Sequence, residues 1–244
     1  MRALAAVGQL RDASGVKTLN SVAFDLTELL DTPVYRGFAN HPFFEKVKSA
    51  PFSTDDVALF IGQWWHPLHY FPTFLARCVS VLPDIESKSF VTRILSQEAG
   101  NGDPRRAHEV IYIDSMALAG FDRAVVAEAA PFRETAALVA GYERASAEPR
   151  SAVGFIFATE VTDLLMVSSI GTAIERVTGL DDNEWVRIHV EQEPDHVESA
   201  EETLLAGFTA DDAPRVNESA QEMWRLWAGF FDRLDAETGA SLVT

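Results

Sequence analysis

The sequence predicts an all-α protein, and three observations support this prediction. Apolar residues recur at intervals of three and four through most of the 244 residues, which is the period of a helix with one buried face. Strand-like runs of β-branched and aromatic residues with a period of two are scarce. Capping residues, prolines and glycines interrupt the apolar pattern at intervals that suit the ends of helices.

The composition predicts one folded domain. Hydrophobic residues make up 47% and charged residues 23% of the chain, as in ordinary globular proteins. We expect a single domain over residues 21–244, preceded by a mobile extension over 1–20. Cys78 is the only cysteine, so no intramolecular disulfide can form. The N-terminus lacks the apolar stretch of a secretory signal, and the predicted location is the cytoplasm.

The charge balance argues against two classes of partner. The 37 acidic residues outnumber the 20 lysines and arginines, which gives a net charge of −17. Such a field repels nucleic-acid phosphates and anionic lipid head groups, so neither nucleic acid nor a membrane is an expected partner. The apolar stretch over 151–174 resembles a membrane span, but Glu160 and Asp163 interrupt it. It is better interpreted as a buried helix.

The helices are expected in a definite order along the chain. Pro33, Gly37 and Pro42 should break the path between the first two, and Ser53 should cap the third. Pro67 and Pro72 should kink or split that third helix. The predicted helices span 21–30, 41–49, 53–82, 85–98, 103–118, 131–146, 150–179, 184–206 and 212–235.

The strongest functional signal is a His-x3-Glu-x2-His pattern at His189, Glu193 and His196. On a helix these positions fall within roughly 60° of arc, so two imidazoles and a carboxylate share one face. Such a set suits iron, manganese or zinc. The alternative is a solvated acidic helix with incidental histidines. Pro194 removes a helical hydrogen bond inside the motif and could redirect that face.

Two further segments carry candidate ligands. Glu98 ends one predicted helix and His108 lies in the first turns of the next, with a glycine-rich turn between the two helices that lets both side chains face one point. Glu160 lies in an otherwise apolar helix, where an unpaired carboxylate would cost several kcal/mol unless it is paired or binds a metal. Asp163, one turn later, competes for the same role.

The order of these motifs resembles the heme-oxygenase-like diiron oxidases and oxygenases, which are relatives of the TenA and PqqC proteins. The resemblance covers roughly residues 40–235 and implies a single compact bundle of about seven core helices. It also implies two Fe(II) ions and six ligands, namely Glu98, His108, Glu160, His189, Glu193 and His196. Glu193 stands where the family usually has Asp, and Pro194 is a second departure. Asp163 and Asp195 are candidates for an extra ligand.

The aromatic segment over 63–74 is expected to form a wall of the interior. Aromatic density of this kind is usually core packing, but buried histidines need partners, so a role in substrate binding is the alternative. The residues assigned to that role are Trp65, His66, His69 and Tyr70. The basic residues that could anchor a substrate carboxylate are scattered, such as Arg77, Arg105, Arg106 and Arg187.

The resemblance predicts an O2-dependent oxidoreductase that acts on a small molecule. An amino acid or amine is favoured as substrate, through N-oxygenation or oxidative C–C cleavage in natural-product biosynthesis. The resemblance also allows for a homodimer, and for an external electron donor such as a reductase or ferredoxin. Two alternatives stay open. One is a metal-free TenA-like or PqqC-like hydrolase or oxidase, and the other is a non-catalytic helical binding protein.

Overall fold

A computed structural model describes residues 25–239 of the chain. The predicted extension over 1–20 lies outside these residues. Within them, the secondary structure is entirely helical, as predicted, and seven helices have eleven residues or more. These are α4 (Thr54–Val81), α5 (Ile85–Glu98), α6 (His108–Leu118), α8 (Arg133–Ala145), α9 (Pro149–Thr178), α10 (Glu184–Gly207) and α11 (Ala213–Glu237). The shorter elements are α1 (Leu26–Leu30), α2 (Pro33–Ala39), α3 (Pro42–Ser49), η1 (Pro104–Arg106) and α7 (Arg123–Ala127).

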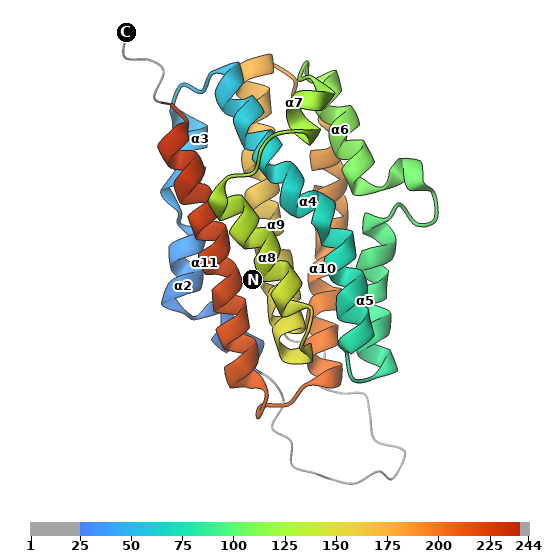
Figure 1. Ribbon diagram of the computed structural model, residues 1–244. Helices are drawn as coiled ribbons and strands as arrows, with labels where there is room; N and C mark the ends of the chain where they lie inside the picture. The colour runs from blue at the N-terminus through green and yellow to red at the C-terminus, as the bar shows by residue number, and fades with distance from the viewer. Residues whose placement is uncertain (1–24, 240–244) are drawn as a thin grey trace, which may run out of the picture.

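Helix α9 is the central element of the bundle (Figure 1). It packs mainly against α10 and α11, while α4 and α8 also contact it. Helix α5 pairs with α10 and α4, and α6 lies against α10. The side chains of α5, α6, α9 and α10 can therefore meet in one interior region.

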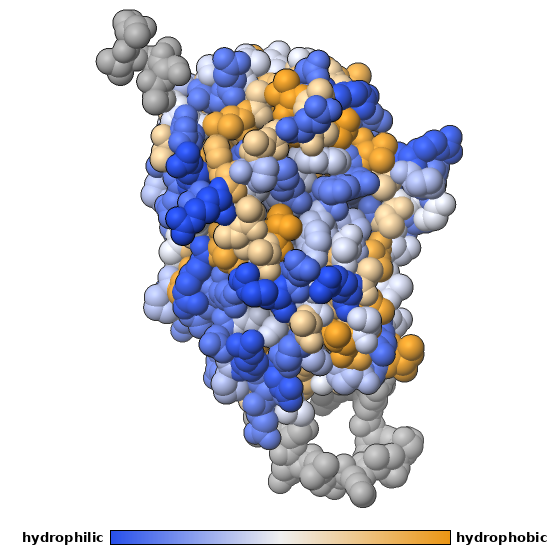
Figure 2. Space-filling model, viewed as in Figure 1, coloured by the Kyte–Doolittle hydropathy of each residue, from blue (hydrophilic) through white to orange (hydrophobic). Residues whose placement is uncertain are grey.

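The apolar composition of α9 serves packing inside the bundle. Within the described part of the chain, it alone is long and apolar enough to cross a membrane, with a mean hydropathy of 1.6 over its most apolar window. Yet 72% of that window is buried inside the protein. On the face drawn in Figure 2, polar side chains predominate and apolar ones are scattered among them.

Helix α4 runs without interruption through both of its prolines, so the alternative of a split helix is wrong. Ser53 and Asp56 form a capping box at its start, in which the Ser53 hydroxyl accepts from the Asp56 amide at 3.1 Å. Each proline removes one hydrogen bond of the helix. The burial of Phe60, Trp64 and neighbouring core side chains on one face of α4 offsets the stability that is lost with these bonds.

Two short helices were not predicted. In α2, Thr32 caps the N-terminus and Pro33 occupies the first helical position, where its fixed φ is favourable and its missing N–H costs nothing. Treating Pro33 as a helix breaker was therefore wrong. In α7, the Asp122 side chain accepts from the Ala124 amide at 2.7 Å. The sequence carries a signal for each of these helices, namely the Thr32-Pro33 pair before α2 and Asp122 before α7.

Candidate metal centre

The turn between α5 and α6 places Glu98 and His108 beside each other. Glu98 is the last residue of α5 and His108 is the first of α6, because the segment after Asp103 forms only the short η1 turn. The helix predicted to restart at 103 thus starts five residues later. Gly100 has φ +83°, and a Cβ there would lie 2.6 Å from the Ala107 nitrogen. Glycine is therefore required for this close turn.

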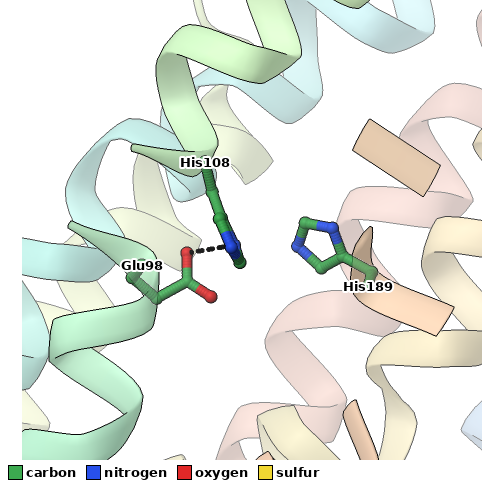
Figure 3. A group of neighbouring side chains, drawn as sticks. All are labelled: Glu98, His108 and His189. Atoms are coloured by element: carbon green, nitrogen blue, oxygen red, sulfur yellow. Dashed lines mark ion pairs between the residues drawn. The ribbon is translucent and has the colours of Figure 1, made fainter. Parts of the chain in front are cut away.

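Glu98, His108 and His189 form the first buried cluster, and their side chains point toward one another from α5, α6 and α10 (Figure 3). The Glu98 Oε2 atom lies 3.0 Å from His108 Nδ1. The His108 and His189 rings are 4.8 Å apart between centroids. His189 Nδ1 lies 2.7 Å from the Trp185 carbonyl oxygen. Since a carbonyl only accepts, Nδ1 carries the proton and Nε2 is left as an acceptor or ligand.

Glu160, Glu193 and His196 form the second buried cluster. His196 Nδ1 lies 3.4 Å from Glu160 Oε2 and 3.8 Å from Glu193 Oε2. The two clusters adjoin, because the same nitrogen lies 4.0 Å from Glu98 Oε1. In each cluster, one candidate ligand atom from every residue lies within 4.8 Å of the others. All six side chains predicted as ligands thus meet in the interior.

Pro194 does not redirect the predicted face of α10. The helix continues through it, and His189, Glu193 and His196 are only 5%, 2% and 2% exposed. Pro194 itself faces solvent, where the missing N–H is tolerated. Asp195 is also exposed and therefore does not reach the clusters, which removes it as a candidate extra ligand. Asp163 remains beside them, since it lines the same small cavity as Glu160 and Glu193.

The clusters contain buried polar atoms that lack hydrogen-bond partners among the described residues. In and beside the second cluster, these atoms are Glu160 Oε1, Asp163 Oδ2, both carboxylate oxygens of Glu193, and His196 Nε2. Buried polar atoms are nearly always satisfied in folded proteins, by protein groups, water or an ion. Lone pairs left over on carboxylates and an imidazole fit a bound transition-metal cation.

The charges in the clusters shift the pKa values in opposite directions. Burial alone would raise the pKa of Glu98, but the neighbouring His108 lowers it to about 2. Burial lowers the pKa of His189 to about 4. Burial would also lower that of His196, but Glu160 raises it to about 9. Burial and the charge of Asp163 raise the pKa of Glu193 strongly. The neighbouring carboxylates thus oppose the ionisation of Asp163 and Glu193.

A small cavity of about 30 Å³ lies between the clusters and α4, with room for about two water-sized molecules. The residues assigned to substrate binding do not line it. His66 bonds to the Ala129 carbonyl at 2.8 Å, and His69 pairs with Glu109 at 2.7 Å. Trp65 stacks on the His69 ring, and Tyr70 is likewise absent from the lining.

The predicted aromatic segment over 63–74 does line this cavity, through residues other than those assigned to substrate binding. From α4, the cavity is lined by Trp64, Leu68 and Phe71, whose i, i+4, i+7 spacing marks one stripe of a helix. That spacing was a signal available in the sequence. Trp185 and Trp227 complete the wall from α10 and α11, which no local pattern could have indicated.

Comparison with solved structures places this architecture in the heme-oxygenase-like fold. A domain of unknown function with a heme oxygenase-like fold from Shewanella denitrificans is 23% identical, with 89% of this chain and 97% of that chain covered and a TM-score of 0.71. A CADD-like protein of unknown function from Nostoc punctiforme is 14% identical, with 89% and 94% covered and a TM-score of 0.69. A TenA homolog from Pseudomonas syringae is 12% identical, with 86% and 92% covered and a TM-score of 0.69.

Comparison with family models identifies the family. Residues 58–228, which span α4 to α11, match the model of the iron-containing redox enzymes. The chain therefore belongs to this iron-containing redox enzyme family, as the motif order predicted. No curated protein matches its sequence significantly.

Proposed function

We propose that the protein is a non-heme diiron oxidase or oxygenase that uses O2 to oxidise a small molecule. The observation that supports this most directly is the pair of adjoining buried clusters, each with three imidazole or carboxylate groups. Mixed nitrogen and oxygen ligands suit iron. Two separate metal-ligand sets in one core are difficult to explain by packing, because each buried carboxylate costs free energy that an apolar side chain would not.

Each cluster would hold one ion. Glu98, His108 and His189 would bind the first, and Glu160, Glu193 and His196 the second. Bound Fe(II) would supply the electrons that activate O2. The longer side chain of Glu193, relative to the Asp usual in the family, would extend its carboxylate further toward the second ion.

The surrounding residues would orient the ligands and control protons and water. The hydrogen bond from His189 to the Trp185 carbonyl holds the tautomer whose Nε2 can bind a metal. The raised pKa of Glu193 keeps its carboxyl protonated without a metal, so iron binding would release a proton. The aromatic wall leaves little room for water beside the clusters.

The finer parts of the proposal concern substrate and electron supply. We favour an amino acid or amine as substrate, in N-oxygenation or oxidative C–C cleavage. N-oxygenation inserts one oxygen atom of O2 into the N–H bond and reduces the other to water. This balance needs two protons and two electrons from an external donor, for which a reductase or ferredoxin is proposed. A homodimer and a cytoplasmic location also remain predictions.

An anaerobic iron titration tests the proposal. Metal-free protein is titrated with Fe(II), desalted and analysed for iron, and O2 uptake is then recorded with an electrode. We expect about two equivalents of iron. His189→Ala and His196→Ala should each lose about one while circular dichroism shows unchanged helix content. Uptake well below one equivalent, or O2 consumption no faster than that of free Fe(II), would favour a metal-free hydrolase or a binding protein and refute the proposal.

A further inference from the structure

Three aromatic side chains connect the surface of the protein with the first cluster, and we call them the aromatic path. They are Trp65 on α4, Tyr112 on α6 and Trp185 on α10. The ring centroids of Trp65 and Tyr112 are 6.4 Å apart, and those of Tyr112 and Trp185 are 4.8 Å apart. The Trp185 ring in turn lies 4.4 Å from the ring of His189, a proposed metal ligand. The aromatic path therefore ends at the proposed metal centre.

The outer end of the aromatic path is accessible to another molecule. All five tryptophans lie in the described part of the chain, and Trp65 alone is not buried. Its ring stacks at 5.0 Å on that of His69, which is exposed. Tyr112 and Trp185 are both completely buried. A partner at the surface can thus contact Trp65 but neither of the two rings behind it.

The residue types of the aromatic path distinguish it from the other aromatic contacts of the core. The cluster around Phe231 consists mainly of phenylalanines, namely Phe38, Phe43, Phe44 and Phe60, whose rings resist one-electron oxidation. Indole and phenol rings can lose one electron to a strong oxidant. Since electron tunnelling weakens steeply with distance, oxidisable rings in near contact are suited to carry electrons between the surface and a buried site.

Hydrogen bonds hold the two inner rings of the aromatic path in place. The Tyr112 hydroxyl donates to the Ile61 carbonyl oxygen at 2.7 Å, and the Trp185 backbone N–H donates to the Ser115 hydroxyl at 3.2 Å. The Trp185 carbonyl oxygen accepts from His189 Nδ1 at 2.7 Å. Trp185 is therefore in contact with this proposed ligand through its backbone as well as its ring.

The surroundings of the two inner rings determine which of them can be oxidised. The Tyr112 hydroxyl donates to a carbonyl oxygen, which does not take up its proton, and burial raises the pKa of this phenol. A tyrosine that keeps its proton is much harder to oxidise. Trp185 can lose an electron and keep its N–H proton, because Nε1 has no acceptor among the described residues. We therefore expect Trp185 to be oxidised, with the Tyr112 ring as a bridge toward Trp65.

We propose that the aromatic path carries electrons one at a time from a donor at the surface to the metal centre. This inference rests on the proposed function, in which bound iron that has reacted with O2 is a strong one-electron oxidant. Trp185 gives one electron to the site and becomes a radical cation. Trp65 replaces this electron across the Tyr112 ring, and the external donor, a reductase or ferredoxin, restores Trp65. Each electron that the site gains is thus one that the donor loses, and no proton moves between the three side chains.

Photo-oxidation of the metal-free protein tests the aromatic path without iron or turnover. The photosensitiser is ruthenium tris-bipyridine with a cobalt(III) ammine as quencher, and it is too large to enter the core. Oxidised tryptophans are then located by mass spectrometry of peptides. We expect modification of Trp65 and also of Trp185, which the photosensitiser does not reach directly because it is buried. Modification of Trp65 without Trp185 would overturn the inference.

Matched variants test the role of each ring. Trp65→Phe should lose the modification of Trp185, whereas Tyr35→Phe should not, since Tyr35 is another half-buried aromatic residue, in contact with Trp224 outside the path. Trp65→Tyr should retain the modification, because a half-exposed phenol can release its proton to water. Tyr112→Phe keeps the bridging ring and should also retain it, but Tyr112→Leu should lose it.

Circular dichroism verifies that each variant is folded. Trp65→Phe changes a half-exposed side chain, so it decides the test even if Tyr112→Leu does not fold. Unchanged modification of Trp185 in Trp65→Phe, or an equal loss in Tyr35→Phe, would refute the aromatic path.

Iron-loaded protein separates this inference from the proposed function. Trp65→Phe and Trp185→Phe should keep the iron stoichiometry of the unmodified protein, because neither side chain is a proposed ligand. After Fe(II)-loaded protein is mixed with O2 without donor or substrate, rapid-freeze EPR should detect a tryptophan radical that Trp185→Phe lacks. Full iron uptake and O2 consumption without this radical would refute the inference alone. Photo-oxidation of Trp185 in a protein that takes up no iron would refute the proposed function.

Discussion

Asp163→Asn should stabilise the metal-free protein, and more so at high pH. Asp163 lies on α9 one turn after Glu160. Burial and the charges of Glu160 and Glu98 raise its pKa from 3.8 to about 7. A carboxyl whose pKa is higher in the folded state favours folding most at pH values below its unfolded pKa. That advantage disappears as the pH rises through the folded pKa, because the buried carboxylate then ionises beside its neighbours.

The size of the effect follows from the pKa difference. About three pH units, at about 1.4 kcal/mol each, give an upper limit of about 4 kcal/mol for ionised Asp163 at pH 8. At pH 5 the same reasoning gives about 2 kcal/mol, because pH 5 lies only about one pH unit above the unfolded pKa of 3.8. For a chain of this length, 1 kcal/mol corresponds to roughly 2–4 °C in Tm. The Tm gain should therefore be roughly 4–8 °C larger at pH 8 than at pH 5.

Thermal melts followed by circular dichroism, with a chelator present, measure this difference. Asp195→Asn is the matched control, since Asp195 is exposed on α10 near the same clusters. Adding Fe(II) should shrink the gain from Asp163→Asn, because a bound cation offsets the repulsion among the carboxylates. An equal gain at both pH values, or an equal gain from the control, would refute the argument that the clusters are destabilised by excess negative charge.

Three further predictions address the ligand set and the packing. Glu193→Asp, which retracts the carboxylate by about 1.3 Å, should change iron stoichiometry or turnover, and Glu193→Gln should lower iron binding more; an equal loss of iron in the exposed control Glu191→Gln would contradict this. Gly154→Ala should lower Tm, because the added Cβ would lie 2.6 Å from a backbone oxygen of α11. The control Gly229→Ala adds a Cβ that meets nothing within 4 Å, so it should be neutral or stabilising. A larger loss of Tm in Gly229→Ala than in Gly154→Ala would refute this packing. Burial raises the pKa of the Cys78 thiol, so a thiol reagent should react with it only as fast as the protein unfolds, and rapid labelling of the folded protein would contradict its burial.

The sequence by itself determined the helical class and most of the candidate site. The three- and four-residue periodicity depends on local geometry, and so does the placing of His189, Glu193 and His196 on one face of α10. The glycine turn after Glu98 requires positive φ, a restriction visible in the residue types themselves. These features follow from the chain within a few residues, which is why they could be predicted.

Only the tertiary structure decided which groups share the interior. The pairing of Glu98 with α10 and of Glu160 with His196 joins segments far apart in the chain. The face of α4 toward the cavity could not be chosen while both faces of 63–74 carried aromatic residues, and packing against α10 and α11 selected Trp64 over Trp65. Burial and pairing are set by the sum of contacts over the whole bundle, and no local pattern encodes that sum.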